Sequence, residues 1–244
     1  MSTVLILGSN SDVGQATAYR FANEGFAIIL ASRNLDDYQK RLASDISIRH
    51  NVATHLTFFD ALKTDEHFQL YQSLPEKPTV VISVFGYLGN HEKAINDFSE
   101  SSLIFNSNFM GNVSILSIIA NEMEKLKRGT IICLSSVAGD RGRKSNYFYG
   151  SAKAALTAFL SGLRGRLLAS NVQVITIIPG FIKTKMVDGL TTPKPVTATP
   201  EKVADTIWMA YTKKKNVVYV LPIWRLIMFV IKNIPEFIFK KMNL

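Results

Sequence analysis

Short apolar runs rich in β-branched residues alternate with longer helical stretches along the whole chain, and this alternation restricts the fold more than any other feature. The pattern predicts seven strands, at 3–7, 27–31, 53–59, 79–85, 129–134, 172–178 and 217–221. It predicts helices between them, near 12–24, 35–49, 64–73, 97–126, 147–169 and 200–212. Strands that are apolar on both faces are typical of a parallel sheet covered by helices on each side. The sequence therefore predicts one doubly wound α/β domain with a seven-stranded, mostly parallel sheet.

The last part of the chain departs from this pattern, so we expect a domain over 1–221 and a C-terminal segment over 222–244. The two prolines of this segment predict two short helices that start at Pro222 and Pro235, with apolar faces interrupted by lysine and arginine. Such a basic amphipathic segment can pack on the domain, on an oligomer partner or on an anionic membrane surface. Within the domain, 185–199 is rich in threonine and proline and predicts a long loop at the ligand-binding edge of the sheet.

Composition excludes several classes of protein. Cys133 is the one cysteine, which rules out an intrachain disulfide and favours a reducing compartment. With four scattered histidines it forms no zinc spacing, so no metal site is expected. The net charge is +9, but residues 213–244 hold seven basic side chains against one acidic side chain. The excess charge belongs to the tail, and we expect no nucleic-acid partner.

The chain opens on an apolar run without the basic region of a signal peptide. The longest uninterrupted apolar run of the tail, 226–231, is far shorter than the ~20 residues of a membrane-spanning helix. We therefore expect a cytoplasmic protein, with peripheral contact at the inner face of the membrane if the C-terminal segment binds lipid.

A turn that contains glycine joins the first expected strand to the first helix. Such a turn points backbone N–H groups and the positive end of the helix at a phosphate, although an ordinary strand-to-helix turn has the same appearance. The candidate cofactor-binding residues of this turn are Gly8, Ser9, Asn10, Ser11, Asp12, Val13 and Gly14.

Arg33 follows the second expected strand at the position where dinucleotide folds place the residue that distinguishes NAD from NADP. A carboxylate there binds the ribose of NAD, whereas a cation accommodates the 2′-phosphate of NADP. The sequence therefore favours NADP(H) over NAD(H), with a solvated surface arginine as the alternative. Asp60 closes the third strand and is placed to touch the adenine, or else to cap a helix.

Tyr149 and Lys153 are four residues apart and share one face of an expected helix. A nearby ammonium group favours phenolate, so we expect the pKa of Tyr149 to lie below its usual ~10. The tyrosine can then act as general acid toward a carbonyl oxygen, and Ser136 at the end of the fifth strand can hydrogen-bond the same oxygen. Tyr147 is a competing candidate, but Lys153 lies six residues away from it.

These motifs resemble those of the short-chain dehydrogenase/reductases over essentially the full length of the chain. The resemblance implies a Rossmann-type fold and a catalytic set of Ser136, Tyr149, Lys153 and Asn108, the last from Asn108-Phe109-Met110-Gly111. The thirteen-residue spacing of the family selects Ser136 over Ser135 and Tyr149 over Tyr147. It also implies a homodimer or homotetramer. The further cofactor contacts it implies are Ala61, Gly86, Tyr149, Lys153, Pro179, Gly180, Ile182 and Thr184.

Two positions depart from the family pattern. Asp12 stands where the family has the middle glycine of its phosphate turn. Ser83-Val84-Phe85-Gly86 replaces the family's Asn-Asn-Ala-Gly after the fourth strand. Both departures concern cofactor contacts, and neither changes the residues expected to carry hydride transfer.

A narrower resemblance covers roughly the second half of the chain. The stretch 135–153 and the tail around Trp224-Arg225 are similar to bacterial reductases that act on polyprenyl-phosphate-linked 2-keto-pentoses. It implies reduction of a ketone on a lipid-linked sugar, with a small or acyl ketone as the alternative substrate. A non-catalytic NADP-binding regulator is the alternative function that we consider for the chain.

Arg141, Arg143 and Lys144 precede Tyr149, and either meet a substrate phosphate or form a solvated loop.

Overall fold

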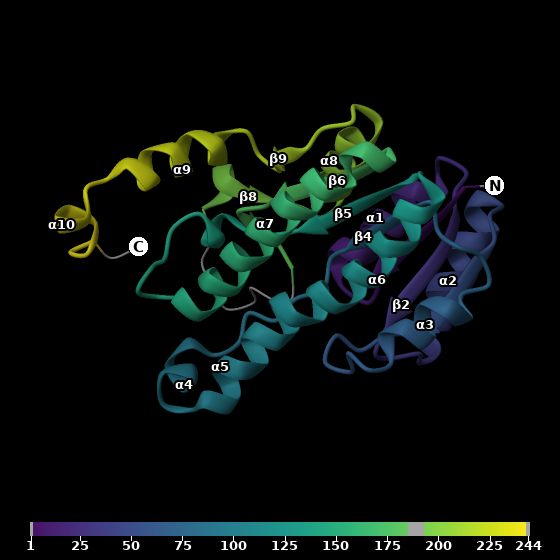
Figure 1. Ribbon diagram of the computed structural model, residues 1–244, viewed down its shortest axis with the longest axis horizontal. Coiled ribbons are helices and arrows are strands. Elements are labelled where there is room, and N and C mark those ends of the chain that lie inside the picture. The colour runs from purple at the N-terminus through teal and green to yellow at the C-terminus, as the bar shows by residue number, and fades with distance from the viewer. Residues whose placement is uncertain (1, 185–192, 243–244) are drawn as a thin grey trace.

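The computed structural model describes residues 2–184 and 193–242. Its main sheet has seven parallel strands in the order β3-β2-β1-β4-β5-β6-β9 (Figure 1). The strands are β1 (Thr3–Leu7), β2 (Ala27–Ser32), β3 (Thr54–Phe58), β4 (Val80–Ser83), β5 (Gly129–Leu134), β6 (Val172–Ile178) and β9 (Val217–Tyr219). The seven-stranded doubly wound fold expected from the sequence is confirmed, and every pairing in the sheet is parallel.

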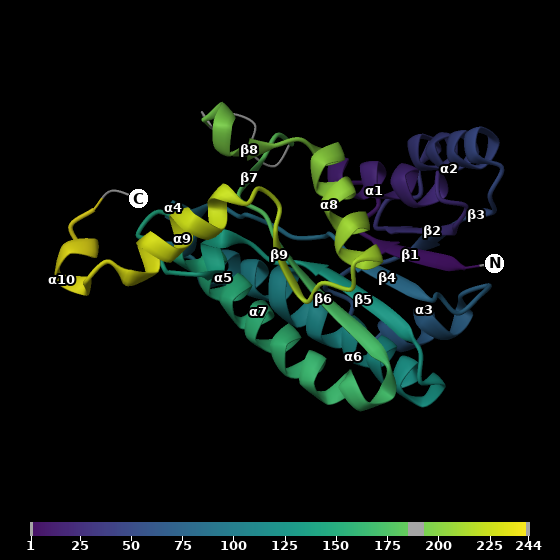
Figure 2. The same ribbon diagram turned by 90° about the horizontal axis from the view of Figure 1, so that it is seen from above.

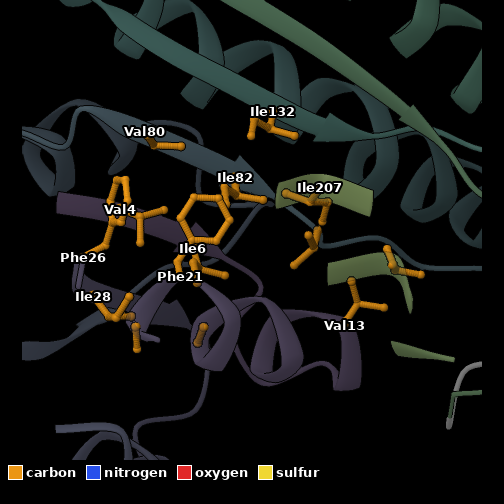
Figure 3. Close-up of a cluster of buried hydrophobic side chains, with 14 of the residues drawn as sticks. Val4, Ile6, Val13, Phe21, Phe26, Ile28, Val80, Ile82, Ile132 and Ile207 are labelled. Carbon is orange, nitrogen blue, oxygen red and sulfur yellow. The ribbon is translucent and has the colours of Figure 1, made fainter. Parts of the chain in front are cut away.

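Helices cover both faces of this sheet. One face carries α1 (Asp12–Ala22), α2 (Asp37–His50) and α8 (Pro200–Thr212), and the other carries α3 (His67–Ser73), α6 (Gly111–Leu126) and α7 (Tyr147–Leu167) (Figure 2). Successive side chains of a strand point to opposite faces of the sheet, so Val4 and Ile6 of β1 belong to one buried cluster while Leu5 and Leu7 belong to the other. Figure 3 shows the first cluster, in which Phe21 of α1 packs against strand residues.

The expected helix over 97–126 is interrupted. It is preceded by α4 (His91–Asn96) and consists of α5 (Phe98–Phe105), a π-helical turn (Asn106–Met110) and α6. By length and hydropathy the run Phe98–Leu126 is sufficient to cross a membrane. Its face toward β5 is fully buried in the core of the domain, at Ile115, Ile119 and neighbouring residues, so we interpret it as a core helix.

The expected loop 185–199 lies partly outside the described residues. Its described end contains a single 3₁₀ turn (Lys194–Val196) and β8 (Thr197–Ala198). β8 pairs with β7 (Phe181–Ile182) in a small parallel sheet. The sequence pattern did not indicate these strands, because a two-residue strand has no measurable periodicity.

The C-terminal segment forms α9 (Ile223–Asn233) and α10 (Glu236–Phe239), each preceded by its proline. α9 packs through Trp224 and Met228 on Val137 and Ile178, which lie at the carboxyl ends of β5 and β6. Figures 1 and 2 place α9 and α10 at the end of the molecule opposite to the N-terminus.

Candidate active site

The crevice between β1 and β4 lies where the strand order reverses, and open α/β sheets bind ligands at this point. Gly8 follows β1 with a positive φ of 92°, and a Cβ at this position would lie 2.9 Å from the Phe85 Cβ. A Cβ on Gly14 would lie 2.5 Å from the Gly8 carbonyl oxygen. Both positions therefore require glycine, since the turn is packed tightly between strand and helix.

Ser11 caps the helix that starts at this turn. Its hydroxyl donates to the Gly8 carbonyl oxygen at 2.8 Å and accepts from the Gly14 N–H at 3.0 Å. Asp12 is the first residue of α1, where the positive end of the helix dipole stabilises a carboxylate. The acidic residue that replaces the family's glycine is therefore accommodated electrostatically by the helix.

Gln39 of α2 is hydrogen-bonded to two residues of the same turn, and the sequence analysis did not identify it. Its buried side-chain oxygen accepts from the Ser9 hydroxyl at 3.2 Å, and its amide donates to the Asn10 side chain at 3.2 Å. Ser9 is fully buried in this contact and does not line the cleft, whereas Asn10 does. No local motif marks Gln39, since its partners are about thirty residues away in sequence.

A cavity of about 330 Å³ occupies one half of the cleft. Gly8, Arg33, Asp60, Ala61 and Gly86 are among the residues that line it. Arg33 is exposed and forms no hydrogen bond or ion pair with any residue of the described ranges. The Asp60 carboxylate accepts from the Leu62 N–H at 3.0 Å, in a turn after β3 rather than at a helix N-terminus.

A second cavity of about 250 Å³ continues the cleft and shares five lining residues with the first, from Asn10-Ser11 and Val84-Phe85-Gly86. It reaches the predicted reacting groups, because Tyr149 and Lys153 line it. Its other predicted lining residues are Asp12, Val13, Pro179, Ile182 and Thr184.

Two of the predicted contacts besides Ser9 lie outside the cleft lining. Gly14 faces the turn itself, and Gly180 packs against the Trp224 ring, where a Cβ would lie 2.0 Å from the ring nitrogen. Both glycines therefore allow close packing of the elements that surround the cleft and do not contact its interior. No sequence pattern indicated Trp224 as the partner of Gly180, because α9 lies more than forty residues further along the chain.

The Ser136 hydroxyl, which accepts from the Ala138 N–H at 3.1 Å, is near enough to the Tyr149 hydroxyl to lower the pKa of the tyrosine, and Lys153 lies on the same face of α7 as the tyrosine. The Lys153 Nζ is 5.8 Å from the Tyr149 ring centroid and donates to the Leu134 carbonyl oxygen at 3.1 Å. Lys153 is 3% exposed, so its ammonium group is held among protein atoms beside the second cavity.

The electrostatics of this group correct one expectation. Burial raises the pKa of Tyr149 to about 12, and the hydrogen bond from Ser136 only partly opposes this. The prediction that the pKa of Tyr149 lies below its usual value is therefore wrong for the chain by itself, because desolvation of the phenolate is the largest effect on it. Burial also lowers the pKa of Lys153 to about 8. Burial thus shifts both groups toward their neutral forms, but with a pKa of about 8 Lys153 still carries its charge at pH 7, whereas Tyr149 is neutral.

Asn108 is fully buried in the π-helical turn, and π-turns occur frequently at functional sites. Its Nδ2 donates to the Tyr87 carbonyl oxygen at 2.6 Å and to the Ile104 carbonyl oxygen at 2.8 Å. Its Oδ1 accepts from the Tyr87 N–H at 3.2 Å. A Cβ on Gly86 would lie 2.7 Å from this Oδ1 and 3.5 Å from the Lys153 Nζ, so Asn108 and Lys153 face the same small space.

Asn112 connects this turn to the sheet and was also missed. Its Nδ2 donates to the Asn108 carbonyl oxygen at 2.9 Å, and its Oδ1 accepts from the Ser83 hydroxyl at 2.6 Å. Cys133 is fully buried, and its thiol lies 3.5 Å from the same Oδ1. Ser83, which departs from the family pattern, therefore finds its partner on α6.

The basic loop before α7 divides into different roles. Arg141 donates to the carbonyl oxygens of Ile231 and Ile234 and pairs with Glu236 at 2.9 Å, so neither a solvated loop nor a phosphate contact describes it. Arg143 lies against the Met228 sulfur at 3.4 Å, and burial lowers the pKa of its guanidinium. Sequence reasoning placed both in the loop correctly but did not see their contacts with α9.

The residues present fit a nicotinamide dinucleotide. The cleft is continuous from Arg33 to Tyr149, its glycines leave room that a Cβ would fill, and it passes over the N-terminus of α1. Among the described residues no cluster of histidine, cysteine and carboxylate side chains has the arrangement of a metal site.

Comparison with known proteins identifies the family. A family model described as short chain dehydrogenase matches residues 2–195, which is most of the chain. The chain belongs to the short-chain dehydrogenases. It is therefore an oxidoreductase of this family, and the expected assignment is confirmed at that level.

Relatives of this short-chain dehydrogenase support the assignment. An uncharacterized oxidoreductase of Mycobacterium tuberculosis (strain ATCC 25618 / H37Rv) is 34% identical over 98% of this chain and 96% of its own. A short chain dehydrogenase from Burkholderia cenocepacia J2315 in complex with NADP superposes with a TM-score of 0.83 at 17% identity, covering 100% of this chain and 98% of its own. One from Sphingobium yanoikuyae in complex with NADPH gives a TM-score of 0.80 at 18% identity and covers 97% of each chain.

Proposed function

We propose that this short-chain dehydrogenase is an NADPH-dependent reductase that converts a ketone into a secondary alcohol. The observation that carries the proposal is that Tyr149 and Lys153 line one end of a continuous cleft, with Ser136 beside the tyrosine and Asn108 beside the lysine just behind the lining. Two hydroxyl groups and a buried ammonium group supply what a carbonyl oxygen needs when it gains negative charge.

The cofactor would lie along the cleft, with its adenosine end between Arg33 and Asp60 and its pyrophosphate over the N-terminus of α1. Its nicotinamide end would meet Tyr149, Lys153 and Thr184. When bound, the reduced nicotinamide supplies a hydride to the ketone carbon, and the ketone oxygen takes up a proton.

Tyr149 is the group that supplies this proton. Its raised pKa means that it holds a proton at neutral pH, as a general acid must. Ser136, whose hydroxyl is the neighbour that lowers the pKa of the tyrosine, would orient the carbonyl oxygen toward it. Lys153 stabilises the phenolate that remains. Asn108 holds its side chain beside the Lys153 ammonium and has a second lone pair on Oδ1 to support a water that returns the proton.

Arg33 supports the preference for NADPH over NADH. It lies at the lip of the first cavity with no carboxylate partner in the described residues, so its guanidinium is available for a 2′-phosphate. Two of the structural relatives contain NADP or NADPH, which agrees with this assignment.

We propose a keto group on a lipid-linked sugar as the substrate, on the basis of the sequence similarity around 135–153 and in the tail. The test is NADPH oxidation, followed at 340 nm, with a polyprenyl-phosphate-linked 2-keto-pentose and with a panel of small and acyl ketones. Turnover of the lipid-linked sugar with the higher kcat/KM supports the proposal. Preferred turnover of a small or acyl ketone assigns that substrate class instead. NADPH binding without turnover of any ketone identifies a regulator.

A further inference from the structure

The two faces of α9 have different surroundings. The inner face is anchored by Trp224, whose ring packs against Gly180 and whose Nε1 donates to the Val196 carbonyl oxygen at 2.9 Å. Met228, one turn further, is fully buried against Val137 and Ile178. α9 is therefore a fixed part of the domain and not a detached tail.

The outer face of the segment is apolar and open. Its large apolar side chains are between 45% and 67% exposed. They are Ile223, Leu226, Phe229, Val230, Phe237 and Ile238, which we call the outer apolar face. A surface groove of about 450 Å³ runs beside it, lined by Tyr219, Leu226 and Phe229 together with basic side chains. Exposed large apolar side chains gathered on one short segment in this way indicate an interaction site.

Basic side chains lie in the same segment as the outer apolar face. Arg225 and Lys232 line the groove of α9, and Lys240 and Lys241 follow α10. The one acidic side chain of the described segment is Glu236, and it is paired with Arg141 at 2.9 Å. Over residues 222–242 the segment therefore presents four exposed cations and no unpaired carboxylate side chain.

Arg141 also fixes the angle between the two helices. Its guanidinium lies 3.7 Å from the Phe239 ring centroid and donates to the carbonyl oxygens that end α9. Phe237 and Ile238 of α10 are thereby held in position relative to α9.

We propose that the outer apolar face and its cations bind the surface of an anionic lipid bilayer. An amphipathic helix with aromatic and aliphatic side chains on one side and cations beside them lies in the headgroup region of such a bilayer. Each cation near the surface adds attraction to anionic headgroups.

A second copy of the chain fits this surface less well. A two-fold axis would bring the same patch of both subunits together, so that Arg225, Lys232, Lys240 and Lys241 would approach their own equivalents. Like charges at an interface oppose association, and Glu236 is already occupied by Arg141. The anionic partner that these cations require is supplied by lipid headgroups.

The proposed membrane contact lies close to the candidate active site. The inner face of α9 touches Gly180 and Val137, which directly follow Pro179 and Ser136. A chain bound through the outer apolar face would hold the reactive end of the cleft beside the bilayer. The inference does not depend on the identity of the ketone, because binding to lipid is measured without turnover.

The experiment is flotation of the full chain with vesicles of phosphatidylcholine alone and with vesicles containing phosphatidylglycerol, at low and at high salt. We expect flotation with the anionic vesicles, and its loss at high salt because the attraction is screened. The double variant Leu226→Ser, Phe229→Ser should weaken the partition coefficient by about 100-fold, since two large apolar side chains no longer enter the bilayer. The double variant Arg225→Gln, Lys232→Gln should weaken binding to the anionic vesicles selectively.

A matched control removes exposed apolar side chains elsewhere. Ile48→Ser with Leu168→Ser alters two side chains that are 81% and 79% exposed and distant in sequence from the segment. This control should float as the wild type does. Absence of flotation with anionic vesicles, or equal loss in the control, overturns the proposal. A dimer that dissociates in the Leu226→Ser, Phe229→Ser variant, without vesicle binding by the wild type, assigns the surface to a second copy instead.

Discussion

The Asn112 side-chain amide donates a hydrogen bond to the main-chain carbonyl oxygen of Asn108 at 2.9 Å, inside the domain core. Asn112 also accepts from Ser83 at 2.6 Å, so one side chain ties β4 to the π-helical turn of the candidate active site. The position of Asn108 is therefore fixed from behind as well as by its own contacts with Tyr87.

We predict that Asn112→Leu destabilises the protein by about 1–3 kcal/mol, because the buried Ser83 hydroxyl loses its acceptor. Urea unfolding measures the change. Asn106→Leu is the matched control, since Asn106 belongs to the same π-turn but makes an exposed contact with Ser102. A change in the unfolding free energy that is equal in both variants would show that the buried network contributes nothing.

Tyr149→Phe tests the proton donor. The variant keeps the ring and loses the hydroxyl group, so we expect NADPH oxidation with an accepted ketone to fall by about 100-fold or more. NADPH binding, followed by thermal stability, should remain. Tyr147→Phe is the control, because Tyr147 begins α7 with its ring against His91 and does not line the cleft. Activity of Tyr149→Phe equal to that of the control would contradict the mechanism.

Arg33→Ala tests whether Arg33 binds the 2′-phosphate that distinguishes NADPH from NADH. We expect the Kd for NADPH to rise by about 10–100-fold while the Kd for NADH stays unchanged, because only NADPH carries the 2′-phosphate. Nicotinamide fluorescence gives both constants. The exposed Arg41 of α2 does not line the cleft, so Arg41→Ala should alter neither. Equal weakening of NADPH and NADH in Arg33→Ala would refute the assignment.

The sequence was sufficient for the groups that local spacing brings together. Tyr149 and Lys153 share a helix face and Ser136 comes just after β5, so helix spacing together with the family's thirteen-residue spacing was enough to predict this group. The contacts of Gln39, Asn112 and Trp224 were missed because their partners come from other elements. The pKa of Tyr149 was predicted in the wrong direction for the same reason: burial depends on the packing of the whole domain.

The lowered pKa of Lys153 predicts a pH-dependent stability. Its pKa is about 8 in the folded chain against an ordinary 10.5, so between these values the unfolded state binds more protons than the folded state. The free energy of unfolding of the wild type should therefore rise with pH across this window, relative to Lys153→Met. Below pH 8 the difference between the two proteins should be constant. Urea unfolding of both proteins from pH 7 to pH 10 measures it, and parallel curves over that range would refute the shift.

Gly180→Ala tests the contact that anchors α9. The added Cβ would lie 2.0 Å from the Trp224 ring nitrogen, so the ring must move and its hydrogen bond to the Val196 carbonyl oxygen is strained. We expect a loss of about 1–3 kcal/mol in unfolding free energy, as is typical of overpacking. Gly162→Ala is the matched control, because Gly162 lies in α7 with no heavy atom within 4 Å of the added Cβ. There the substitution should stabilise the helix by about 0.5–1 kcal/mol, so the two alanine variants should shift the unfolding midpoint in opposite directions. A shift of the same sign in both would show that Trp224 does not hold α9 on the domain.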